Sequence, residues 1–171
     1  VIDTDLRWFL LLQLVSAGLR GNDDIATELA SDDTATGRRQ AATARASVPT
    51  AEAKQWAWEE IFHNADLPNA MLEAAIAGFA DRDHRDLTDA YLDSYFDALP
   101  GVWAERTMEI AQSITMGLFP IYSIEDSTID RADRFLASDP SPALARLVAE
   151  GRDGLLRAQR ARERDGDSAA D

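Results

Sequence analysis

The chain has 171 residues, of which 46% are hydrophobic, and its 31 acidic and 17 basic side chains give a formal charge of −14. That length suits one domain, and that charge disfavours nucleic acids and anionic membranes as partners, because both are bound by Lys and Arg side chains that neutralise phosphates. The chain contains no cysteine, which excludes disulfides and thiolate metal sites and fits a cytoplasmic location. We therefore expect a single domain over residues 1–163, followed by a disordered tail over 164–171 because that segment has no apolar face.

Helix start and stop signals recur along the chain, and no segment shows the sustained period-two alternation of a strand. Asp3 or Thr4 can cap the first helix and Gly18 can end it, whereas Pro49 separates two later helices and Pro100 two others. The all-α pattern predicts about eight or nine helices, near residues 4–17, 22–30, 34–47, 50–63, 68–80, 87–99, 103–118, 127–136 and 141–155.

Short helices with short connections pack as antiparallel neighbours, which gives either a compact bundle or an α-solenoid. The solenoid is favoured because none of the expected helices is long enough to form the walls of a large four-helix bundle. In the first helix, the stretch WFLLLQLV, Trp8–Val15, has apolar side chains around most of its circumference. This helix is therefore either the central helix of the domain or one covered partly by a missing neighbour. The start at Val1, without a methionine, fits a piece of a longer protein.

Two histidine pairs are the candidates for metal chemistry, since no nucleophile elbow, P-loop or dinucleotide motif is present. Glu60-x-x-His63 and Asp81-x-x-His84 have the spacing that helical di-metal carboxylate enzymes use. The second pair, however, falls past the end of its expected helix, and surface histidines beside carboxylates explain both pairs equally simply. We expect no metal site in this chain and keep the di-metal enzyme as an alternative.

A basic segment interrupts this acidic chain, because residues 34–51 contain Arg38, Arg39 and Arg45 and no carboxylate. Arg38 and Arg45 are seven residues apart and share one helix stripe, whereas Arg39 points about 100° away. The alanines of the same helix allow close packing on one face, which leaves the guanidinium groups free to bind carboxylates on another. The two interpretations are salt bridges to nearby acids such as Asp32 and Asp33, or a face that docks a domain or a peptide carboxylate.

Four sequence segments, taken together and in this order, resemble a known family: TATGRRQAATARASVPTAEAKQWAWEEI, LPNAMLEAAIAGF, YLDSYFDALPGVWAERTMEIAQSITMGLFP and LARLVAEGRDGLLRAQRAR. From about Asp3 to Arg162 the chain resembles the C-terminal helical domain of zinc aminopeptidases of the aminopeptidase N type, in their bacterial, actinobacterial-like form. It also resembles the related C-terminal domain of the endoplasmic-reticulum aminopeptidases. The resemblance implies an α-solenoid of HEAT-like or armadillo-like helix pairs that closes over a catalytic domain of the same chain.

The same resemblance implies a domain that gates or orients peptide substrates without catalysing their cleavage. The zinc would belong to the catalytic domain of the parent enzyme, because the family's H-E-x-x-H signature is absent here and no catalytic or zinc residue is carried over. In some relatives this domain contacts the far end of the peptide through basic side chains, which makes Arg38, Arg39 and Arg45 candidates for peptide or domain contact. The alternative functions are a free-standing helical-repeat scaffold that binds a protein partner and the di-metal enzyme.

Overall fold

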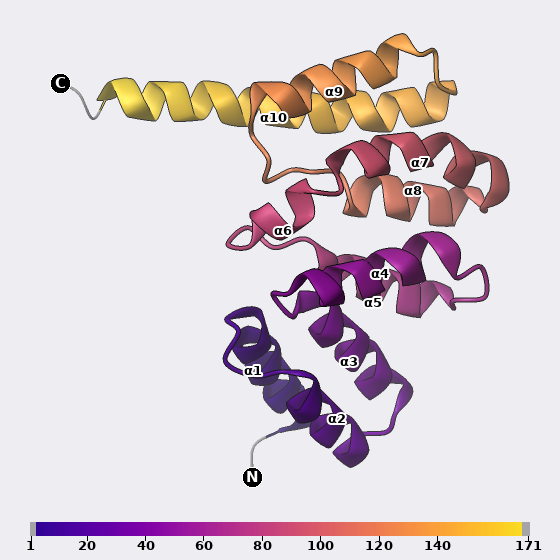
Figure 1. Cartoon of the computed structure of the whole chain (residues 1–171), viewed down its shortest axis with the longest axis vertical. Helices are drawn as coiled ribbons and strands as arrows, with labels where there is room; N and C mark the ends of the chain where they lie inside the picture. The colour runs from indigo at the N-terminus through magenta and orange to yellow at the C-terminus, as the bar shows by residue number, and fades with distance from the viewer. Residues whose placement is uncertain (1–2, 169–171) are drawn as a thin grey trace. The chain divides into compact units, whose positions relative to one another are not determined.

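The computed structural model describes residues 3–168, and throughout that range the chain forms helices joined by turns and short loops, with no strand (Figure 1). The expectation of an all-α fold is confirmed. The described range contains ten helices, so the expected count of eight or nine is not confirmed. The helices are α1 (Thr4–Ser16), α2 (Asn22–Ser31), α3 (Ala35–Ser47), α4 (Ala51–His63), α5 (Asn69–Phe79), α6 (Arg85–Asp89), α7 (Leu92–Glu105), α8 (Met108–Gly117), α9 (Asp126–Ala137) and α10 (Pro142–Ser168).

The chain divides into two compact units, residues 1–88 and 89–171, and the boundary falls within the short helix α6. The first unit contains α1 to α5 and the second contains α7 to α10. The single domain over 1–163 and the solenoid arrangement of helix pairs stay predictions. Helix α10 reaches into the expected tail at 164–171, whose last three residues lie outside the described range, so the tail also stays a prediction.

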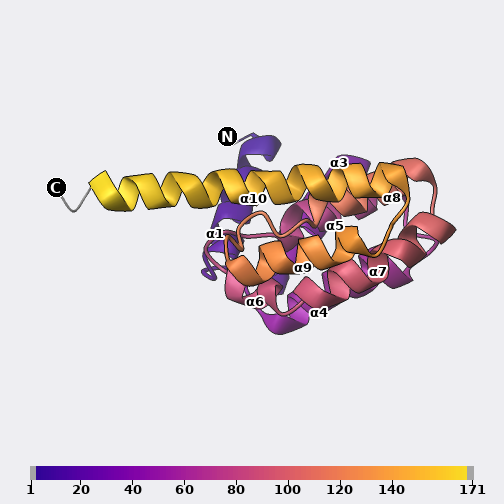
Figure 2. The same cartoon turned by 90° about the horizontal axis from the view of Figure 1, so that it is seen from above.

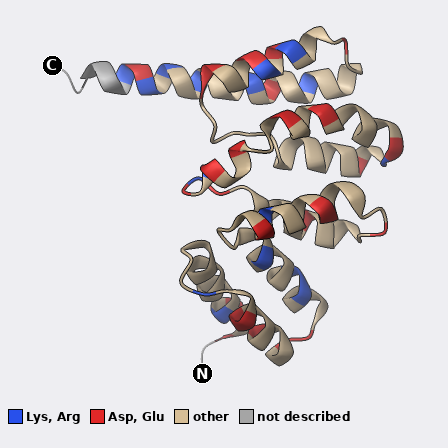
Figure 3. Ribbon diagram, in the orientation of Figure 1, with Lys and Arg blue, Asp and Glu red and all other residues tan. Residues whose placement is uncertain are grey.

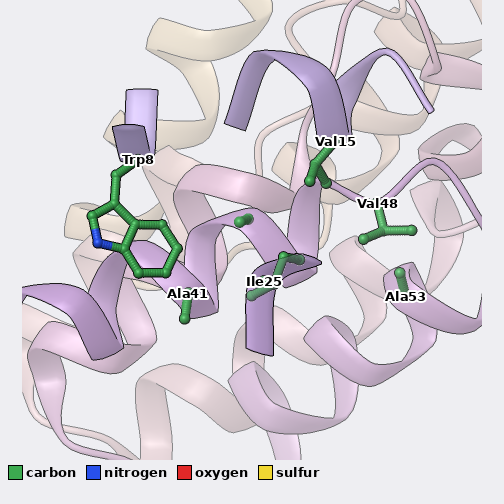
Figure 4. Packing of buried hydrophobic residues seen from close by; sticks show 7 residues of the cluster. Trp8, Val15, Ile25, Ala41, Val48 and Ala53 are labelled. Atoms are coloured by element: carbon green, nitrogen blue, oxygen red, sulfur yellow. The ribbon is translucent and has the colours of Figure 1, made fainter. Parts of the chain in front are cut away.

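Helix α3 is the centre of the first unit, because it packs against α1, α2, α4 and α5 (Figure 1). Its alanines from Ala41 onward are buried, and Gly78 of α5 approaches so closely that a Cβ atom there would lie 2.1 Å from the carbonyl oxygen of Thr43. Trp8 and Val15 of α1 pack with Ile25 of α2 onto this helix (Figure 4). The expectation that small residues on α3 allow close packing is therefore confirmed.

The boundaries of these helices follow from their caps. The hydroxyl oxygen of Thr34 accepts a hydrogen bond of 3.0 Å from the backbone N–H of Gly37, and Thr50 accepts one from Ala53 at 3.2 Å. Gly18 has a φ of 71° just after α1, a conformation that glycine adopts without strain. The predicted starts of the third and fourth helices and the predicted end of the first are thus confirmed to within a residue or two.

Lys54, the one lysine of the sequence, is completely buried between α3, α4 and α5. Its Nζ donates hydrogen bonds to the carbonyl oxygens of Ala46, at 2.7 Å, and Gly78, at 3.1 Å, which lie in the last turns of α3 and α5. Burial lowers the pKa of Lys54 from its ordinary value of 10.5 to about 8, and the negative charge of Asp81 opposes that change. The side chain therefore joins three helices through backbone groups that helix ends leave without partners.

In the second unit, α10 runs alongside α9 and continues beyond it (Figures 1 and 2), and it also packs on α8. The Tyr95 hydroxyl donates to the carbonyl oxygen of Thr115 at 2.6 Å, and the Trp103 indole donates to the Thr115 hydroxyl at 2.9 Å, which joins α7 to α8. The expected helix end at Pro100 was wrong, because Pro100 lies inside α7. The chain instead breaks at Arg106, after which Thr107 caps α8. Among the described helices, none is both long enough and apolar enough to cross a membrane.

Candidate functional site

A pocket of about 500 Å³ lies in the first unit, between α2, α3, α4 and α5. Most of its lining is apolar, and two arginines and one asparagine supply its polar groups. The lining residues are Asn22, Ile25, Ala26, Leu29, Arg38, Ala41, Ala42, Arg45, Trp56 and Met71. Two of the three arginines that the sequence singles out therefore border the same cavity.

Helix α3 builds one wall of this pocket through its periodicity. Arg38, Ala41, Ala42 and Arg45 follow one another at spacings of three, one and three residues, so that they form a single stripe. The two alanines are buried and leave space because their side chains are short, whereas the two arginines are exposed at the ends of the stripe. Figure 3, in which basic residues are blue and acidic ones red, shows blue on this helix, which contains arginines and no acidic residue.

Arg45 is held by an aromatic ring. Its Cζ atom lies 3.9 Å from the ring centroid of Trp56, the distance of a close cation–π contact. Within the described part of the chain, Arg45 has no carboxylate partner. The contact with the indole orients the guanidinium group and leaves N–H donors, which lie in the plane of the guanidinium group, available for an anion.

Arg38 has a partner, Asp33, which precedes α3. The Nε and Nη2 atoms of Arg38 lie 2.8 and 2.7 Å from the same carboxylate oxygen of Asp33. Both side chains are more than half exposed, and exposed ion pairs contribute little net stability because water and salt screen them. The salt-bridge interpretation is therefore correct for Arg38, although so weak a pair can be exchanged for another carboxylate at little cost.

Arg39 lies outside the pocket. Its Nη2 donates to the hydroxyl of Thr36 at 2.9 Å, and the side chain is exposed on another face of α3. Since it shares a helix with Arg38 and Arg45 but not their stripe, Arg39 provides a matched control for both.

Trp56 and Met71 are pocket residues that the sequence reasoning did not identify. Trp56 and Trp58 are two residues apart on α4, so they point to different faces. Trp58 is buried and stacks on Phe62 with ring centroids 4.1 Å apart, whereas Trp56 is only half-buried and faces Arg45. The signal that was available is that two tryptophans at this spacing do not both face one core.

The two histidines do not form a shared site. His63 is exposed at the end of α4, 3.9 Å from Glu59, whereas the Nε2 atom of His84 lies 3.1 Å from the backbone carbonyl oxygen of Ser16. The Ser16 hydroxyl donates to Asp81 rather than to a histidine. Over residues 3–168, no three His, Asp or Glu side chains are grouped in a way that could hold a metal ion.

Comparison with known proteins identifies the family. Residues 1–157 match the sequence model of the ERAP1-like C-terminal domain. The chain belongs to this family. It is also 48% identical over 169 residues to Aminopeptidase N of Streptomyces lividans, an alignment that covers 98% of this chain and 20% of that protein. The chain therefore spans about a fifth of the length of this relative and matches its C-terminal part, which confirms the resemblance found in the sequence.

Proposed function

We propose that this chain is the non-catalytic C-terminal domain of a zinc aminopeptidase that removes residues from the N-terminus of peptides. Its helix pairs form a HEAT-like solenoid that closes over the active site and gates or orients the peptide. The family match and the name of the relative support this proposal. The zinc belongs to the catalytic domain of the parent protein, and the cytoplasm is the proposed location.

The pocket bordered by Arg38 and Arg45 binds the far end of the peptide in this proposal. The observation that carries it is the Arg45 guanidinium, which is oriented by Trp56 and lacks a carboxylate partner among the described residues. A guanidinium group binds a carboxylate through two parallel hydrogen bonds, as a peptide C-terminus requires. The adjoining apolar cavity of about 500 Å³ falls within the size range of ligand pockets and has room for an apolar last side chain.

The acidic character of the chain makes this pocket selective. A formal charge of −14 repels carboxylates in general, so a free peptide C-terminus is attracted only where the local charge is positive. Peptides long enough to reach from the active site to the pocket are anchored at both ends. Shorter substrates depend on the active site alone.

The test is a kinetic comparison in the natural full-length polypeptide that contains this chain. We expect Arg38→Ala combined with Arg45→Ala to raise the KM for long peptides by about tenfold or more, because hydrogen bonds to charged groups contribute roughly 1.5–3 kcal/mol. Single-residue chromogenic substrates should be cleaved as before. Arg39→Ala should change neither, since that side chain is exposed outside the pocket.

A substrate pair sharpens the same test. A long peptide with a free C-terminal carboxylate and the same peptide with a C-terminal amide differ in the one group that the arginines are proposed to bind. The double variant should lose the preference for the free acid. An equal loss on long peptides and chromogenic substrates, or an unchanged preference for the acid, would contradict the proposed role of the pocket.

The gene upstream of the Val1 codon separates this function from its alternative. A continuous reading frame that carries H-E-x-x-H and a later zinc-binding glutamate supports the aminopeptidase. A start codon close to Val1 would favour a free-standing helical-repeat scaffold.

A further inference from the structure

Helix α1 has two apolar faces, and the described residues cover only one of them. Trp8 and Val15 are at most 1% exposed and pack on α2 and α3 (Figure 4). The other large apolar residues of the helix include four whose exposed fractions lie between 38% and 57%: Leu6, Phe9, Leu10 and Leu14. Of the two interpretations of this helix, the central helix buried all round is thus not met, since α3 occupies the centre.

The exposed residues form a continuous stripe. Leu6, Phe9, Leu10 and Leu14 are spaced at i, i+3, i+4 and i+8, which places them on one side of the helix, with Gln13 as the polar residue between them. This spacing is the one by which an amphipathic helix packs on a neighbour. We name these four residues the outer face of α1.

We propose that the outer face of α1 is covered by a helix formed from the residues that immediately precede Val1 in the parent polypeptide. This inference rests on the proposed function, because it requires the chain to continue from a larger protein. The relative from Streptomyces lividans is about five times as long and matches this chain through its C-terminal part, so its equivalent of α1 has a long preceding segment.

The location and charge favour this occupant over a second copy of the chain. The outer face belongs to the first helix, the element nearest in sequence to any preceding segment. Loops between packed helices have about 2–8 residues and helices about 10–14, which places the covering helix within about 25 residues before Val1. A dimer formed through this face would instead bring together two chains that each carry a charge of −14.

The test is photo-cross-linking in the natural full-length polypeptide. The photoreactive residue p-benzoylphenylalanine replaces Phe9, which it resembles in shape, and mass spectrometry then identifies the cross-linked peptide. The matched control has the same residue at Met108 of α8, another exposed apolar position, with 65% of its surface accessible. We expect the Phe9 position to cross-link within the same polypeptide to a peptide just before Val1 and the Met108 position to form no such cross-link.

Three results would overturn the inference. These are a dimer band from cross-linking to a second copy, the absence of any cross-link at the Phe9 position, and a cross-link only to residues after Val1. Aminopeptidase activity of the same polypeptide, measured separately, distinguishes the two proposals. An active enzyme without the upstream cross-link would support the proposed function and contradict this inference. An inactive polypeptide with the cross-link would support this inference and contradict the proposed function.

Discussion

The protonation of Lys54 should make the stability of the first unit depend on pH. Its pKa is about 8 in the folded chain and 10.5 when unperturbed, so between these values the unfolded chain binds more protons than the folded one. The free energy of unfolding therefore rises with pH in this window and is independent of this group below pH 8. Integration over the two pKa values gives a rise of about 2.5 kcal/mol between pH 7 and pH 10.

The variant Lys54→Met isolates this contribution, because the sequence has no other lysine. The substitution removes the ammonium group and leaves the carbonyl oxygens of Ala46 and Gly78 without their donor, at a cost of about 1–3 kcal/mol for each. At pH 7 the variant also avoids the free-energy cost of burying the charged ammonium group, about 3 kcal/mol, which offsets part of that loss.

Urea unfolding of both proteins at pH 7, 8, 9 and 10, followed by tryptophan fluorescence, measures the difference. The difference in the free energy of unfolding between the wild-type protein and the variant should shift by about 2.5 kcal/mol in favour of the wild type over this range. The measurement stops at pH 10 because burial raises the pKa of Tyr95. At higher pH the unfolded chain loses the Tyr95 proton while the folded chain keeps it, so the free energy of unfolding falls with pH. A difference that does not change with pH would show that the two carbonyl bonds and Asp81 fully offset the burial of the charge.

The other predictions concern packing, capping and the pocket. Gly78→Ala should destabilise the protein by about 2 kcal/mol or more in thermal or urea unfolding, because its Cβ would overlap a carbonyl oxygen of α3, whereas Gly101→Ala, with open space in α7, should stabilise it by about 0.5–1 kcal/mol. Thr34→Ala should cost about 1 kcal/mol in the same assay through loss of the α3 cap. Trp56→Leu should raise the Kd of a long free-acid peptide at least about twofold, measured by calorimetry, since a cation–π contact contributes roughly 0.5–2 kcal/mol to holding the guanidinium in place.

The helix boundaries in the first unit could be predicted because local chemistry determines them. The hydroxyls of Thr34 and Thr50 satisfy free N–H groups, and these bonds need no information from distant parts of the chain. The boundary at Pro100 was mispredicted because distant packing outweighs a local cost of about 3 kcal/mol for proline inside a helix. Leu99 and Val102, on either side of it, are both buried, so ending the helix there would expose apolar surface.

The candidate site was only partly predictable for a related reason. The spacing of Arg38 and Arg45 places them on one stripe of a helix, whatever surrounds that helix. The pocket between them, however, also needs Ile25 and Met71, which come from different helices. The contact of Arg45 with Trp56 depends on how α3 and α4 pack, and no local pattern specifies that packing.

The outer face of α1 illustrates what a hydrophobic pattern says about burial. A helix that is apolar around its circumference needs partners on more than one side, because each uncovered large apolar side chain costs free energy in water. The pattern does not say where those partners come from. Trp8 and Val15 find theirs in α2 and α3, whereas Phe9 and Leu10 remain 57% and 44% exposed among the described residues. Since isolated monomers rarely keep such a stripe exposed, the second partner is a polypeptide segment outside these 171 residues, which is the reason to probe Phe9 in the full-length protein.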